Sequence, residues 1–221
     1  MVINPTQKIS VEALKLQLLK QKTTRERFRI PMTKKQVEDA LTAAYQAEVE
    51  FRKRICIMDE CTKSNISSFA SFLTDDGSKF GVMFSGMCGN GKTTLVLAFQ
   101  NLLNYLNDRG LFDSSDIGLS VLDAKDIVRQ SKNQSSFDQL KRRDMIAIED
   151  MGREPVEILE YGNVINPVID LLEYRYDAQL FTVITTNLVP KEIRERYGSR
   201  IADRLNEMVA KIVFENETYR K

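Results

Sequence analysis

The stretch that decides the fold reads Gly86-Met87-Cys88-Gly89-Asn90-Gly91-Lys92-Thr93-Thr94. It satisfies the phosphate-loop pattern, in which glycine, any four residues and a second glycine are followed by lysine and then by serine or threonine. An apolar run from Phe80 to Ser85 precedes the loop, and apolar residues at helical spacing follow it from Leu95 to Leu106. Because such a loop must lie between a strand and a helix, this context supports the match.

The residue types of this loop suit a nucleoside triphosphate. Glycines let the backbone wrap tightly, so that N–H groups point at the β-phosphate with the positive end of a helix behind them. The side chain of Lys92 is expected to reach the β- and γ-phosphates, and the Thr93 hydroxyl to bind Mg²⁺. The predicted nucleotide-binding residues are Gly86, Cys88, Gly89, Asn90, Gly91, Lys92, Thr93 and Thr94.

Two carboxylates end a second apolar run. Residues 144–150 read Asp-Met-Ile-Ala-Ile-Glu-Asp, so Glu149 and Asp150 come at the carboxyl end of a predicted strand. Open α/β sheets bind ligands at this edge, where the phosphate loop is also expected. One carboxylate is needed for the hydration shell of Mg²⁺ and another for the attacking water. Thr93, Glu149 and Asp150 are therefore the predicted metal site; the alternative is two acids in an ordinary turn.

A polar residue also follows the apolar run at residues 180–186. Asn187 is expected near the γ-phosphate and the attacking water, if this run is another strand of the same sheet. The alternative is an asparagine that caps the next helix.

Two arginines share one face of a later predicted helix. Arg200 and Arg204 are four residues apart, which suits an arginine finger acting on the phosphoryl group of a neighbouring subunit. The alternative is a pair of ordinary ion pairs, for which Asp203 and Glu207 are available.

Composition limits the class of protein. The 221 residues suffice for one α/β domain with a modest appendage. The chain has 32 basic and 31 acidic residues, so net charge favours neither a nucleic-acid binder nor an acidic-surface protein. We expect a cytoplasmic protein without membrane contact, because no signal core is evident and no apolar run approaches about 18 residues.

The numbers of cysteine and histidine residues limit the disulfides and the catalytic groups that the chain can form. Three scattered cysteines argue against a disulfide framework. The chain has no histidine, which excludes triads built on histidine, so any general base is a carboxylate.

Residues 1–60 are predicted to be a helical segment, separate from a main domain at residues 61–221. Ser10 can cap a short helix, and Thr33 with Gln36 forms a capping box for a longer one. Between them, residues 15–35 carry eight basic residues and one acidic residue. This stretch is either a solvated helix face and linker or a contact for the DNA backbone or a partner protein.

The motifs, in this order and spacing, resemble the AAA+ ATPases of the DnaC and IstB group. The resemblance covers roughly residues 65–221 and rests most specifically on Thr185-Thr186-Asn187-Leu188 and on residues 198–205, Gly-Ser-Arg-Ile-Ala-Asp-Arg-Leu. It implies a P-loop NTPase fold: a five-stranded parallel sheet of order 5-1-4-3-2 flanked by helices, without a C-terminal lid. The five strands are expected near Val82, Leu119, Ile146, Val183 and Val213.

The resemblance also implies roles. Glu149 and Asp150 would be the Walker B pair, Asn187 would be sensor 1, and Arg204, ahead of Arg200, would be the finger. The usual acidic pair is Asp-Glu or Asp-Asp, whereas here glutamate comes first. A displacement of about 1 Å at a catalytic group can cost on the order of 100-fold in rate, so slow intrinsic hydrolysis is expected.

Three functional hypotheses remain open. The first is a DnaC-like loader of a replicative helicase acting in DNA replication, and the second is an IstB-like helper of a transposase. The third is a nucleotide-gated binding module with little hydrolysis; a small-molecule kinase is the weakest option, because no second substrate region is evident. The expected cofactors are ATP and Mg²⁺. The expected partners are DNA, single-stranded for the loader, a helicase or transposase, and further copies of the chain.

Overall fold

A five-stranded parallel sheet forms the centre of the computed structural model, which describes residues 10–21, 27–112, 117–156, 158–160 and 163–219. The strands are β1 (Gly81–Gly86), β2 (Ser120–Asp123), β3 (Met145–Met151), β6 (Phe181–Thr186) and β7 (Val209–Phe214). They lie in the order β2-β3-β6-β1-β7, and every neighbouring pair is parallel. Counted along the chain this is 2-3-4-1-5, which confirms the predicted order read from the opposite edge.

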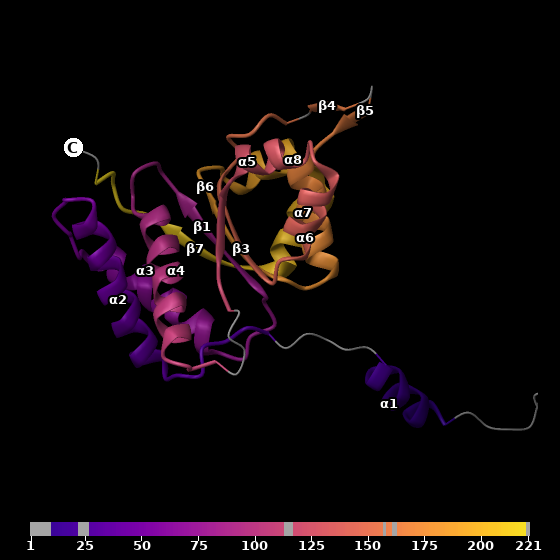
Figure 1. The fold of residues 1–221 in the computed structure, drawn as a ribbon, viewed down its shortest axis with the longest axis horizontal. Helices are drawn as coiled ribbons and strands as arrows, with labels where there is room; N and C mark the ends of the chain where they lie inside the picture. Colours follow the sequence, from indigo (N-terminus) through magenta and orange to yellow (C-terminus); the bar gives the residue numbers. More distant parts are fainter. Residues whose placement is uncertain (1–9, 22–26, 113–116, 157, 161–162, 220–221) are drawn as a thin grey trace, which may run out of the picture.

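The helices are α1 (Val11–Gln21), α2 (Lys34–Phe51), α3 (Glu60–Thr74), α4 (Lys92–Asp108), α5 (Ala124–Gln130), α6 (Gln134–Arg142), α7 (Pro167–Asp177) and α8 (Pro190–Met208). Those from α2 to α8 cover both faces of the sheet (Figure 1). Helices α2, α3 and α4 pack on one face, and α5 to α8 pack on the other. A short antiparallel hairpin, β4 (Ile158–Glu160) and β5 (Asn163–Ile165), lies between β3 and α7. No described helix is both long and apolar enough to cross a membrane.

Capping residues set the starts of the N-terminal helices as the sequence predicts. The Thr33 hydroxyl accepts from the Gln36 backbone N–H at 3.3 Å, and the Gln36 side chain accepts from the Thr33 N–H at 3.0 Å. The Ser10 hydroxyl oxygen accepts from the Ala13 N–H at 3.3 Å at the start of α1. Asp59 caps α3, which therefore begins at Glu60.

The helix α2 shares its apolar core with the sheet. Val37, Leu41 and Tyr45 are buried against α3 and α4, in the same cluster as β1 residues such as Phe84. The described residues 34–51 are thus not a separate hydrophobic unit. The predicted division after residue 60 stays a prediction, and residues 1–9 and 22–26 lie outside the described residues.

A fully buried arginine forms hydrogen bonds to several segments at the amino ends of β3 and β6. Arg175 of α7 donates to the carbonyl oxygens of Arg143 at 2.7 Å and of Phe181 at 2.6 Å, and to the Thr182 hydroxyl at 2.8 Å. Longer contacts reach the carbonyl oxygens of Lys141 and Asp144. This one side chain therefore joins the end of α6, the segment entering β3 and the start of β6. The strand β3 carries Glu149 and Asp150, and β6 leads to Asn187.

Candidate nucleotide-binding site

The phosphate loop runs from the end of β1 to the start of α4, as predicted. Gly91 is the N-cap of α4 and has a left-handed φ of 97°. A Cβ at Gly91 would lie 2.4 Å from the Tyr45 hydroxyl oxygen, and a Cβ at Gly86 would lie 2.3 Å from the Phe214 carbonyl oxygen. Both positions therefore require glycine, because neighbouring elements press directly on the loop.

The Lys92 side chain lies inside the curve of the loop. Its ammonium donates to the carbonyl oxygens of Gly86 and Met87, each at 2.7 Å, and to the Asn90 side-chain oxygen at 3.1 Å. The Asn90 amide in turn donates to the Phe214 carbonyl oxygen of β7 at 3.0 Å. The loop thus holds a buried cation at the amino end of a helix, an arrangement suited to phosphate oxygens.

The first carboxylate of β3 is largely buried beside the phosphate loop. Burial raises the pKa of Glu149, and the neighbouring Asp150 and Asp123 charges add to this, whereas a hydrogen bond from Thr93 and the Arg52 charge oppose it. One Glu149 oxygen is buried without a hydrogen-bond partner. An unsatisfied carboxylate oxygen next to a threonine hydroxyl fits the hydration shell of Mg²⁺.

The described residues contain no group of three or more acidic or cysteine side chains that could hold a metal ion. Mg²⁺ is commonly held by one or two protein oxygens together with waters and substrate phosphates, so Thr93 and Glu149 suffice for it.

The second carboxylate is turned into the cavity by a strained backbone. Asp150 has a φ of 54°, and its N–H donates to the Thr185 hydroxyl at 2.9 Å. A non-glycine residue in this left-handed region is uncommon and typical of functional sites. The Asp150 carboxylate forms an ion pair with Arg153, which sequence reasoning did not single out.

The cavity next to these groups has a volume of about 690 Å³, within the range of small-molecule sites. Among the predicted residues it is lined by Cys88, Gly89, Asn90, Gly91, Lys92, Thr93, Thr94, Asp150 and Asn187. The lining residues that the sequence did not indicate are Tyr45, Val49, Arg52, Arg54, Ile55, Ile57, Arg153, Thr218 and Tyr219. Gly86 and Glu149 lie beside the cavity and do not line it.

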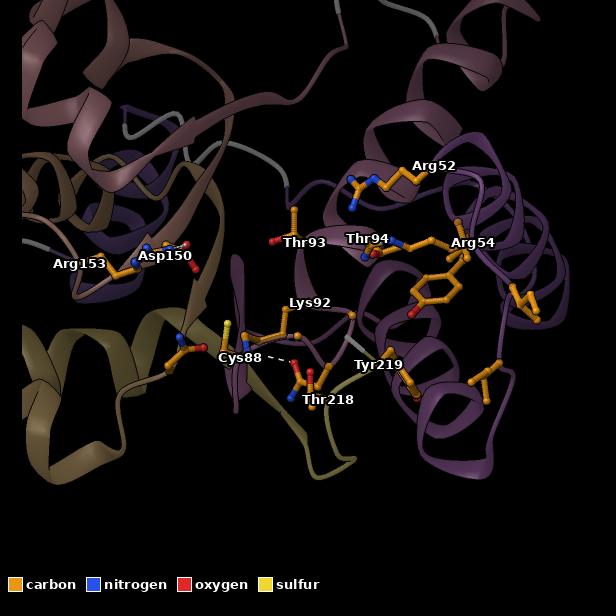
Figure 2. Close-up of a pocket in the computed structure, with 18 residues that line it drawn as sticks. Arg52, Arg54, Cys88, Lys92, Thr93, Thr94, Asp150, Arg153, Thr218 and Tyr219 are labelled. Carbon is orange, nitrogen blue, oxygen red and sulfur yellow. Dashed lines mark hydrogen bonds and ion pairs between the residues drawn. The ribbon is translucent and has the colours of Figure 1, made fainter. Parts of the chain in front are cut away.

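The cavity has two chemically different ends. Figure 2 shows Asp150 and Arg153 on one side of Lys92, and Arg54 and Tyr219 on the other. The first end is polar. At the second end Tyr219 and Arg54 lie together (Figure 2), and Tyr45 meets Tyr219 at Gly91. The cavity is also lined by the aliphatic side chains of Val49, Ile55 and Ile57. A molecule with a charged end and a flat ring matches this lining.

Asn187 lines the cavity and does not cap the helix that follows it. The N-cap of α8 is Val189, whose N–H donates to the Glu192 side chain at 2.8 Å. The capping alternative is therefore wrong, and Asn187 lies at the same cavity as Asp150.

The two candidate finger arginines do not line this cavity. The Arg204 guanidinium lies 3.1 Å from a Glu173 carboxylate oxygen and stacks 4.9 Å from the centre of the Tyr176 ring, and Arg200 lies 3.2 Å from the same Glu173 oxygen. The acids suggested by the sequence have other partners: Asp203 binds Arg194, and Glu207 accepts from Tyr176. The ion pairs of Arg200 and Arg204 thus run to α7 and not along α8.

A phosphate loop between β1 and α4, with acids at the end of β3 and Asn187 after β6 in a sheet of this strand order, defines an AAA+ P-loop NTPase fold. No family model and no curated protein matches the chain.

Solved structures do match the fold. The DnaC helicase loader matches with a TM-score of 0.58 at 19% identity, over 78% of this chain and 99% of that one. DnaI matches with a TM-score of 0.55 at 16% identity, over 86% of this chain and 98% of that one. AMPPCP-bound DnaA from Aquifex aeolicus matches with a TM-score of 0.50 at 16% identity, over 74% of this chain and 50% of that one.

Proposed function

We propose that this protein binds ATP with Mg²⁺ and hydrolyses it slowly, as an AAA+ ATPase of DNA replication related to helicase loaders. The observation that carries the proposal is the buried Lys92 ammonium inside a glycine loop, next to Thr93 and the unpartnered Glu149 oxygen. The similarity to the fold of DnaA, which is bound to the ATP analogue AMPPCP in its solved structure, supports the choice of nucleotide.

The residues in and beside the phosphate loop would have separate roles. Lys92 would bind the β- and γ-phosphates, and Thr93 with Glu149 would hold the metal and its waters. Bound Mg²⁺ would neutralise charge that develops on the phosphate oxygens. Asp150 would orient or deprotonate the attacking water, and Asn187 would position it against the γ-phosphate.

Slow hydrolysis follows from the position of Asp150. Its carboxylate is held by Arg153, so it must leave or share that ion pair before it can bind water. The same contact favours the second candidate function, a nucleotide-gated binding module with little turnover.

The finger proposal requires a second copy of the chain. Arg204 lies outside its own cavity and is held by Glu173 and Asp177, at 3.1 and 3.6 Å. In a head-to-tail assembly Arg204, with Arg200 in support, would exchange these acids for the γ-phosphate bound by the neighbouring subunit. ATP would then control self-association. We also propose a cytoplasmic location, with DNA and a replicative helicase as partners and the first 60 residues as the partner contact.

The test is phosphate release by the purified protein with ATP and Mg²⁺, alone and with single-stranded or duplex DNA. Stimulation by single strands supports a helicase loader, whereas stimulation by duplex supports the transposition-helper alternative. Release at the level of the Lys92→Ala variant under every condition would contradict the ATPase. ATP binding without release would leave the nucleotide-gated module.

A further inference from the structure

The segment that follows β7 crosses the phosphate loop. The Tyr219 backbone N–H donates to the Gly89 carbonyl oxygen at 2.9 Å, and the Asn216 side-chain amide donates to the Asn90 carbonyl oxygen at 3.1 Å. We call residues Asn216–Tyr219 the strap. Two consecutive carbonyl groups of the loop are thus held by a segment more than a hundred residues away in the sequence.

The strap also fixes the position of an aromatic ring. The Tyr219 hydroxyl donates to an Asp59 carboxylate oxygen at 2.6 Å, and it lies 2.7 Å from the Thr62 hydroxyl, from which it accepts. Burial raises the pKa of Tyr219, and the bond to Asp59 adds to this, so the phenol keeps its proton. With its backbone and its hydroxyl both held, the ring is placed before any ligand arrives, which lowers the entropy cost of binding.

The ring lies beside the phosphate loop. A Cβ at Gly91, the N-cap of α4, would lie 3.7 Å from a Tyr219 ring carbon and 2.4 Å from the Tyr45 hydroxyl oxygen. Tyr219 lines the cavity on the side of Lys92 away from Asp150 (Figure 2). Ile55, which is 91% exposed, and Ile57, which is 50% exposed, also line the cavity. A fixed aromatic ring with exposed apolar side chains in the same cavity suits the flat face of a base.

We infer that the strap forms one wall of the nucleotide site and that the Tyr219 ring contacts the base, which makes Tyr219 a determinant of nucleoside recognition. This inference rests on the proposed nucleotide binding and deepens it. The strap acts on the ligand in two ways: Asn216 supports the carbonyl edge of the phosphate loop, and Tyr219 supplies a stacking surface for the nucleoside.

Two ligands separate these actions, namely ATP and inorganic tripolyphosphate, which has no nucleoside. Calorimetric titration with Mg²⁺ would compare the parent with Tyr219→Ala and Asn216→Ala. Because loss of a stacking side chain costs about 1–3 kcal/mol per base, Tyr219→Ala should raise the Kd for ATP at least about fivefold. Its Kd for tripolyphosphate should stay within about twofold of the parent. Asn216→Ala should weaken both ligands by the same factor, because it acts through the loop.

Controls address folding and the role of the hydroxyl. Tyr105→Ala removes an exposed tyrosine of α4 that does not line the cavity, and it should change neither Kd. Tyr219→Phe keeps the ring and loses both hydroxyl contacts, so its Kd for ATP should fall between those of the parent and the alanine variant. Melting temperatures of all variants establish that they fold.

The outcomes are distinct. Equal weakening of ATP and tripolyphosphate by Tyr219→Ala, or no weakening of ATP, overturns the base contact. Unchanged binding of both ligands by Asn216→Ala overturns the support of the loop. If the parent itself binds neither ligand, the proposed nucleotide binding fails, which is a different result.

Discussion

Replacing Arg175 with methionine should destabilise the whole sheet, because this buried side chain satisfies acceptors from three segments. Three of its contacts are short: 2.6 Å to the Phe181 carbonyl oxygen, 2.7 Å to that of Arg143 and 2.8 Å to the Thr182 hydroxyl. Methionine fills much of the space but donates no hydrogen bond, so each of these acceptors loses its bond from the guanidinium. Each unsatisfied buried group costs about 1–3 kcal/mol.

Removal of the charge offsets part of this loss. A buried guanidinium carries a desolvation penalty, which methionine does not, so we take the lower bound of about 1 kcal/mol for each of the three short contacts. The expected loss in the free energy of unfolding is about 3 kcal/mol. For a protein of this size that corresponds to a melting temperature lower by about 6–12 °C.

Chemical denaturation monitored by circular dichroism measures this loss. The control is Arg142→Met on α6, whose exposed side chain should change the free energy of unfolding by no more than about 0.5 kcal/mol. If Arg175→Met unfolds within about 0.5 kcal/mol of the parent, the buried arginine does not hold β3 and β6 together as described.

Three further substitutions and one pH titration test the acids of β3 and the finger. Because the pKa of Glu149 is raised, its buried charge lowers the stability of the fold above that pKa. Glu149→Gln should therefore raise the melting temperature at neutral pH, and it should weaken Mg²⁺-dependent ATP binding. A lower melting temperature would contradict the burial of this carboxylate. For the same reason Mg²⁺-dependent affinity for ATP in the parent should decline as the pH falls toward the raised pKa, at a higher pH than an exposed glutamate would allow, as titrations at several pH values would reveal. Arg153→Ala should speed phosphate release by freeing Asp150, and a slower rate would indicate that Arg153 itself serves the reaction. Arg204→Ala should abolish phosphate release and spare ATP binding, and equal rates in mutant and parent would remove Arg204 from the site.

The correct predictions from the sequence came from local patterns of residues. The glycine loop, the acids at the end of β3 and Asn187 after β6 were all evident, because each follows an apolar run that forms a strand of one parallel sheet. The strand order was also predicted correctly, through the resemblance to a known group. These features depend on neighbours in the sequence or on a shared sheet edge.

Contacts made by tertiary packing were not predictable in this way. Tyr45 and Tyr219 meet at Gly91 although 174 positions separate them, and neither belongs to a recognisable motif. The helix α6 was missed because Phe137 and Leu140 are its only buried apolar residues among many polar ones. Residues 52–57 were treated as part of a separate segment, so the basic and aliphatic side chains that line the cavity there went unrecognised.

Calorimetric titration of the purified protein with ATP and Mg²⁺ tests directly whether the phosphate loop binds nucleotide. The matched variants are Lys92→Ala, which removes the buried ammonium, and Lys35→Ala, which removes an exposed one on α2. We expect saturable binding by the parent and by Lys35→Ala, with binding lost or weakened by at least about tenfold in Lys92→Ala. Equal affinity of the Lys92→Ala variant and the parent, or no binding by a folded parent, would contradict this expectation.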